Sequence, residues 1–129
     1  EGLARYGMHL GTAFQLVDDV LDYSGDEAAT GKHLGDDLAE GKPTLPLIHA
    51  MKHGSAAQSA CVRHAIETGG REALPGVLAA IRATGALDET RCHAEAEARL
   101  ALAAVAPLPA STFKDSLVQL ASFAVARDF

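Results

Sequence analysis

Hydrophobic residues recur every three or four positions through most of this chain, a spacing that predicts helices. Over residues 1–23 the apolar positions cover a broad arc of the helical circumference. The narrow stripe that remains carries Gly11, Gln15, Asp18 and Asp22, with Asp19 at its flank. A helix that is apolar nearly all round is normally buried, so we expect this acidic stripe to face a cleft rather than open water.

Further helices follow after a loop that we expect from Ser24 to Asp37. They are predicted at residues 42–54, 55–70, 74–85 and 89–106, and from residue 111 onward. Ser55 with Gln58 forms a predicted capping box, and Asp88 and Ser111 are expected to cap the last two helices. One face of the last helix should carry Phe113, Leu117, Leu120, Ala121 and Ala124. We find no strand pattern and no internal repeat, so the predicted fold is all-α, a bundle of about six helices.

The charge balance narrows the choice of partners. The chain has 11 basic and 17 acidic residues in 129, a net charge of −6, and no run of Lys and Arg. This balance disfavours nucleic acid, and an anionic ligand would have to be captured by a few placed cations or by metal. The residues contain no apolar stretch of membrane-spanning length and no signal-peptide pattern, so a cytoplasmic location is expected.

Asp18 and Asp22 lie one helical turn apart, close enough to repel each other when both are ionised. A divalent cation removes this repulsion, and Mg²⁺ prefers one or two carboxylates completed by water and phosphate oxygens. The alternative is a solvated acidic helix face, the usual outcome for such pairs. The apolar surroundings and Gln15 on the same stripe weaken that alternative.

Lys32 and Lys42 each follow a glycine, where backbone approaches an anion easily. The spacing around Lys42 does not fit a phosphate-binding P-loop, because Pro43 follows the lysine and no strand precedes it. For either lysine alone, a surface charge in a loop is the competing interpretation. His49 and His53 are spaced to share a metal ion, but no third ligand is evident, and a polar helix face is favoured.

The run "AFQLVDDVLDY" followed by "GKHLGDDLAEGKPTLPLIHAM" resembles the second aspartate-rich region of the trans-isoprenyl diphosphate synthases. The similarity extends over essentially the whole chain. The stretches "ATGALDETRCHAEAEA" and "AVARDF" are similar to the long-chain bacterial branch, particularly the octaprenyl diphosphate synthases. The chain also starts directly in helical pattern, without a methionine, and holds no second D-D-x-x-D. We therefore interpret residues 1–129 as the C-terminal part of such a synthase domain with an isoprenoid-synthase fold.

The resemblance implies a Mg²⁺-dependent prenyltransferase that elongates an allylic diphosphate with isopentenyl diphosphate. By similarity, Asp18 and Asp22 would hold the metal, with Asp19 as an alternate ligand or as a side chain just outside the directly bound ligands. Lys32 and Lys42 would contact the diphosphate. The resemblance also implies that Phe14 and Gln15 line the cavity near the allylic carbons. It further implies that Asp37 orders the loop and that Arg127 approaches the second substrate.

The product implied is a long all-trans polyprenyl diphosphate, octaprenyl if the nearest resemblance holds, used for quinone side chains such as that of ubiquinone. Members of this family are usually homodimers. The chain alone is expected to be inactive, because the first aspartate-rich motif is absent from it. The alternative from another class is a non-catalytic regulatory or assembly subunit of a heteromeric prenyl synthase, which would need no intact set of aspartates and lysines.

Overall fold

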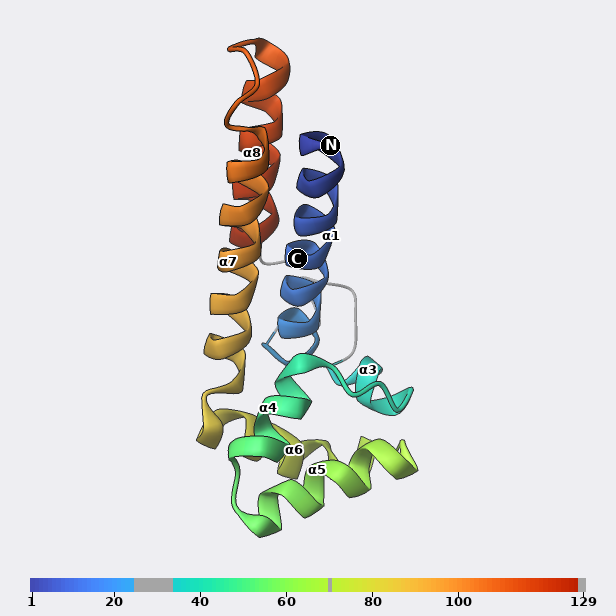
Figure 1. Ribbon diagram of the computed structural model, residues 1–129. Coiled ribbons are helices and arrows are strands. Elements are labelled where there is room, and N and C mark those ends of the chain that lie inside the picture. Colours follow the sequence, from blue (N-terminus) through green and yellow to red (C-terminus); the bar gives the residue numbers. More distant parts are fainter. Residues whose placement is uncertain (25–33, 70, 128–129) are drawn as a thin grey trace. The chain divides into compact units, whose positions relative to one another are not determined.

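The structure is a computed structural model that describes residues 1–24, 34–69 and 71–127. All regular structure in these ranges is helical, which confirms the predicted all-α class (Figure 1). The helices are α1 (Gly2–Ser24), α3 (Asp36–Ala39), α4 (Leu45–His53), α5 (Ala56–Thr68), the 3-10 helix η1 (Arg71–Ala73), α6 (Leu74–Thr84), α7 (Ala86–Val105) and α8 (Thr112–Ala126). None of these described helices is long and apolar enough to cross a bilayer.

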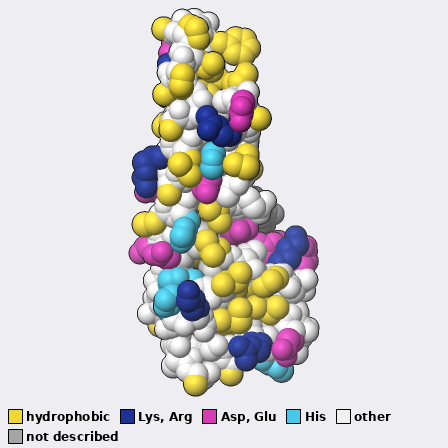
Figure 2. Space-filling view, in the orientation of Figure 1, with side chains coloured by type: hydrophobic (Ala, Val, Ile, Leu, Met, Phe, Trp, Pro, Cys, Tyr) yellow, Lys and Arg dark blue, Asp and Glu magenta, His cyan; other side chains and the backbone are white. Residues whose placement is uncertain are grey.

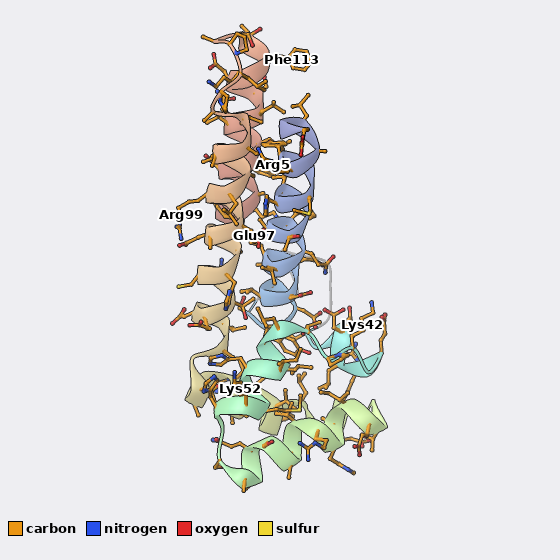
Figure 3. All side chains as sticks on the ribbon, in the orientation of Figure 1. Arg5, Lys42, Lys52, Glu97, Arg99 and Phe113 are labelled. Atoms are coloured by element: carbon orange, nitrogen blue, oxygen red, sulfur yellow. The ribbon has the colours of Figure 1, made fainter. Side chains whose placement is uncertain are left out.

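The chain divides into two compact units. The first comprises Glu1–Asp18 and the described part of Arg91–Asp128, and it contains most of α1 and α7 and all of α8. Its core is formed by Tyr6, Ala101, Val105 and Ala121, with Leu10, Leu102 and Leu117 packed against them. Figure 3 labels Glu97 of α7, whose carboxylate lies 2.5 Å from Nδ1 of His9 on α1.

The second unit comprises the described residues of Asp19–Thr90. Its core gathers residues from the end of α1 and from α3 to α6: Tyr23, Leu38, Leu47, Val62, Val77 and Ile81. The capping box of Ser55 and Gln58 at the start of α5 is confirmed by both of its hydrogen bonds. α6 ends at Gly85, whose φ of 65° is the left-handed conformation that glycine adopts without a steric penalty.

Three sequence predictions about helix limits were incomplete. Asp88 does not cap α7, because the helix already begins at Ala86 and Asp88 lies in its first turn. There its negative charge still favours the helix N-terminus. α3 and η1 lie in segments expected to be irregular. Helices of four and three residues are too short to leave a periodic pattern in the sequence.

The expectation that the first helix is buried nearly all round was wrong for its N-terminal half. The side chains of Leu3, Met8 and Phe14 are about half exposed, and Phe113 on α8 is 80% exposed. Hydrophobic side chains are visible at the surface of this unit, near the connection from α7 to α8 (Figure 2). The apolar arcs of these helices are broader than the faces that pack against one another within the unit, so part of each arc is exposed.

Candidate functional site

The first unit holds Phe14, Gln15 and Asp18, the part of the acidic stripe that lies before the end of α1. Gln15 is exposed, and the Phe14 ring is 48% exposed. The Asp18 side chain is 35% exposed. These residues therefore lie at a surface of the unit, where a ligand could reach them.

Arg127, at the C-terminal end of α8, contacts this same turn of α1. Its Nη2 donates a hydrogen bond of 2.7 Å to the backbone oxygen of Phe14. Its guanidinium carbon lies 3.8 Å from the centroid of the Phe14 ring, and Nη2 lies 3.9 Å from Oδ1 of Asp18. Burial lowers the pKa of Arg127, and the nearby Asp18 carboxylate partly opposes this. The guanidinium stays charged because its ordinary pKa is so high.

The second unit holds Asp19 and Asp22, and both side chains are buried. Asp22 Oδ2 accepts a hydrogen bond of 3.1 Å from the backbone N–H of Asp37. The backbone oxygen of Asp22 accepts another, of 2.9 Å, from the N–H of Gly35. Asp22 therefore fastens the start of α3 to the end of α1, a link between residues fifteen positions apart that local sequence patterns do not reveal.

Lys42 lies shortly after α3 in the chain and is labelled in Figure 3. Its Nζ lies 2.7 Å from Oε2 of Glu40 and 3.9 Å from Oδ1 of Asp37. The hydrogen bond to Glu40 is the main cause that raises the pKa of Lys42, and the charges of Glu40, Asp37 and Asp22 add to it. Because the side chain is 58% exposed, it can exchange Glu40 for a more highly charged anion at little cost.

The turn before α3 is held by contacts with Arg71 and Leu74. Gly35 has φ 80°, and a Cβ there would lie 2.8 Å from a methyl of Leu74. The Arg71 guanidinium forms an ion pair with Asp36 and donates a 3.0 Å hydrogen bond to the backbone oxygen of Leu34. These contacts fix the backbone on which Asp37 and Lys42 are mounted.

Two buried hydroxyls next to this acidic cluster were missed by sequence analysis. Neither Tyr23 Oη nor Thr44 Oγ1 makes a hydrogen bond of normal geometry in the part of the chain that the structure describes. Burial raises the pKa of Tyr23 above its ordinary range, and the charges of Asp22, Asp37 and Asp19 raise it further. Thr44 Oγ1 is near enough to oppose this rise weakly, but the geometry does not make it a hydrogen-bond partner.

The structure thus brings together some of the predicted site residues within each unit. In the second unit Asp22, Asp37 and Lys42 form one cluster. In the first, Phe14 and Asp18 share Arg127. Lys32 lies outside the described residues. His49 makes a 3.1 Å contact with the backbone oxygen of Thr84 and stacks beside His53, in keeping with a polar helix face.

Carboxylate oxygens are ligands that Mg²⁺ prefers. Among the described residues no group of three or more His, Cys, Asp or Glu side chains is arranged to hold a metal ion by itself. Mg²⁺ does not need one, because it takes one or two carboxylates and completes its shell with water and substrate phosphates. Asp18 in the first unit and Asp22 in the second each offer a carboxylate oxygen of this kind.

An all-helical fold with an aspartate-rich helix followed by a Gly-Lys segment defines the class of protein. A family model described as polyprenyl synthetase matches residues 1–82, and the chain belongs to this family. It is 54% identical to the octaprenyl diphosphate synthases of Haemophilus influenzae, over 130 residues, and of Escherichia coli, over 129. These matches include 100% and 99% of this chain, respectively, but only 40% of each relative. The chain thus spans well under half the length of these curated relatives.

Solved structures agree with this assignment. The polyprenyl synthase of Caulobacter crescentus, complexed with calcium and isoprenyl diphosphate, matches with a TM-score of 0.90 and 40% identity, over 100% of this chain and 40% of that one. The geranylgeranyl pyrophosphate synthase of Corynebacterium glutamicum, complexed with isoprenyl diphosphate and magnesium, matches with a TM-score of 0.85 and 32% identity, over 98% and 37%. The resemblance seen in the sequence and its all-α class are therefore confirmed.

Proposed function

We propose that residues 1–129 form the C-terminal part of a long-chain trans-polyprenyl diphosphate synthase domain. The enzyme would elongate an allylic diphosphate with isopentenyl diphosphate to octaprenyl diphosphate, for quinone side chains. The observation that carries this proposal is the buried carboxylate of Asp22, bonded to the Asp37 N–H beside Lys42. The 54% identity to octaprenyl diphosphate synthases supports the product assignment.

In the proposed reaction the allylic carbon–oxygen bond breaks and diphosphate leaves. The double bond of isopentenyl diphosphate forms the new carbon–carbon bond, and one proton is lost. Catalysis therefore requires charge neutralisation on the departing diphosphate. Mg²⁺ held by Asp18 and Asp22, with Asp19 as a second or alternate ligand, would supply part of that neutralisation when bound.

The residues of this chain would do the remaining work as follows. Lys42 would leave Glu40 and contact diphosphate oxygens, while Asp37 keeps the backbone of its loop on the end of α1. Lys32 is proposed to contact the same diphosphate. Phe14 and Gln15, both exposed on α1, would border the cavity that receives the growing chain. We also propose a cytoplasmic homodimer, following the family resemblance.

The proposal is tested with the full-length protein or with a chimera. In the chimera this chain replaces the matching segment of the Escherichia coli octaprenyl diphosphate synthase, to which it is 54% identical. Incubation with farnesyl diphosphate, isopentenyl diphosphate and Mg²⁺ should give a ladder of products ending at one long polyprenyl diphosphate. The 129-residue chain alone should show no turnover, and EDTA should abolish elongation by the intact enzyme.

The second candidate is a non-catalytic subunit of a heteromeric synthase. A Bacillus subtilis protein described as component 2 of heptaprenyl diphosphate synthase is 27% identical over 129 residues, and this description indicates a synthase made of more than one component. A folded full-length protein that shows no Mg²⁺-dependent elongation would support this candidate and contradict the first.

A further inference from the structure

Arg127 is the C-cap residue of α8, and nearly all of its side chain is buried. Only 5% of the side chain is exposed. Burying a guanidinium is costly unless hydrogen bonds and charges compensate it. Contacts with one helical turn of α1, which carries Phe14 and Asp18, supply part of this compensation.

Three contacts join Arg127 to this turn. The hydrogen bond of 2.7 Å reaches the backbone oxygen of Phe14, which is also the α-helical acceptor for the amide of Asp18. The guanidinium carbon lies over the Phe14 ring, 3.8 Å from its centroid, and Asp18 Oδ1 is 3.9 Å from the same nitrogen that bonds the carbonyl. One planar group thus contacts the ring, the backbone and the carboxylate of a single turn.

These contacts restrict the side chains of Phe14 and Asp18. The Phe14 ring is half exposed, so packing alone does not hold it in one rotamer. A cation over one face of the ring favours a single ring orientation, and the fixed charge 3.9 Å from Oδ1 of Asp18 favours one position of that side chain. Lysine could not reproduce this set, because an ammonium is not planar and cannot both stack and donate in a fixed direction.

We propose that Arg127 is a positioning residue that holds the Phe14–Asp18 turn of α1 in the geometry needed for prenyl transfer. This inference rests on the proposed function, in which Phe14 borders the cavity and Asp18 helps to hold the metal. It differs from the role implied by family resemblance, in which Arg127 approaches the second substrate. In this structure its charged end instead lies against the protein's own α1.

The chain offers a matched control for the test. The Tyr6 hydroxyl donates a hydrogen bond of 2.6 Å to the backbone oxygen of Leu117, so it joins the same two helices, α1 and α8, at another level. Tyr6→Phe removes that link without touching the Phe14–Asp18 turn. A purely structural effect of Arg127 should therefore be reproduced by Tyr6→Phe at an equal loss of thermal stability.

The experiment compares Arg127→Met, Arg127→Lys and Tyr6→Phe in the full-length protein, with kcat, KM for isopentenyl diphosphate and Tm measured for each. We expect both Arg127 variants to lose ~10-fold or more in kcat, since small misplacements of catalytic groups have effects of this size, with KM nearly unchanged. Tyr6→Phe should keep kcat. Equal kcat in all three variants overturns the proposal, and a raised KM at normal kcat assigns Arg127 to substrate binding instead.

A second measurement separates this proposal from the proposed function. With 4-fluorophenylalanine incorporated at position 14, the ¹⁹F resonance should shift and broaden in Arg127→Met and Arg127→Lys, but not in Tyr6→Phe. Should the unmodified protein show no elongation at all, the proposed function fails while the fluorine spectra still decide whether Arg127 orders the ring. Unchanged spectra in the Arg127 variants contradict the positioning role whatever the activity.

Discussion

The chain has two tyrosines, and the structure gives opposite predictions for removing their hydroxyls. Tyr23 Oη is buried and makes no hydrogen bond of normal geometry in the described part of the chain. Burying a hydroxyl without a partner costs ~1–3 kcal/mol, so removing it should stabilise the folded state. The void left by the missing oxygen reduces this gain. Tyr23→Phe should therefore raise the free energy of unfolding by about 1 kcal/mol.

Tyr6→Phe should do the reverse. The Tyr6 hydroxyl donates a hydrogen bond of 2.6 Å to Leu117, and losing it should lower the free energy of unfolding by ~1 kcal/mol. The same atom is deleted in both variants, so changes in the hydration of the unfolded chain largely cancel. The two variants should therefore differ from each other by about 2 kcal/mol.

Urea unfolding followed by circular dichroism measures this difference as opposite shifts of the midpoint at a constant m-value. A double-mutant cycle of Tyr23→Phe with Thr44→Val should give a coupling energy near zero, because the two hydroxyls are not hydrogen-bonded. A loss of stability in Tyr23→Phe equal to that in Tyr6→Phe would refute the reasoning. It would show that the hydroxyl has a partner, such as a buried water.

Three further predictions follow. Because folding raises the pKa of Tyr23 above 10.0, its contribution to the free energy of unfolding is complete below pH 10 and is lost as the pH rises further, by up to ~1.4 kcal/mol per pH unit. If Tyr23→Phe loses stability with the same slope at alkaline pH, this prediction is contradicted. Gly35→Ala should lower the free energy of unfolding by ~1–2 kcal/mol, because of the φ of 80° at Gly35 and the contact with Leu74. Gly7→Ala in α1 should raise it by ~0.5–1 kcal/mol, because a Cβ at Gly7 meets nothing within 4 Å. Equal urea midpoints for the two variants would exclude this account. Asp18→Ala in the full-length enzyme should lower kcat by ~100-fold or more, and near-normal turnover in the elongation assay would remove Asp18 from the site.

Features set by a few neighbouring residues were predictable from the sequence. The capping box at Ser55 and the N-cap at Ser111 each require only a side chain within three residues, and both were found as predicted. The end of α6 at Gly85 follows from the conformational freedom of glycine. The start of α7 was misplaced because the helix begins at Ala86, and Asp88 was taken for its N-cap.

The candidate site was predictable only in its residue types. The spacing of Asp18 and Asp22 places them on one side of a helix, but nothing local indicates that Asp22 is buried or that its carboxylate bonds the N–H of Asp37. The contact of Arg127 with Phe14 joins residues 113 positions apart. Such contacts depend on how helices pack, which is decided by many small burial terms at once rather than by any motif.

These long-range contacts explain how α1 can carry so many carboxylates beside an apolar face. Asp18 has the buried guanidinium of Arg127 at 3.9 Å, and Asp22 has a backbone donor and the nearby charge of Lys42. Each carboxylate is therefore stabilised by a segment that is distant in sequence and becomes available only after folding. In an isolated α1 helix the aspartates would repel one another without compensation. Tertiary contacts thus stabilise the carboxylates of the acidic stripe. Variants that loosen α3 or the end of α8 should disturb the positions of these carboxylates before they unfold the helix itself.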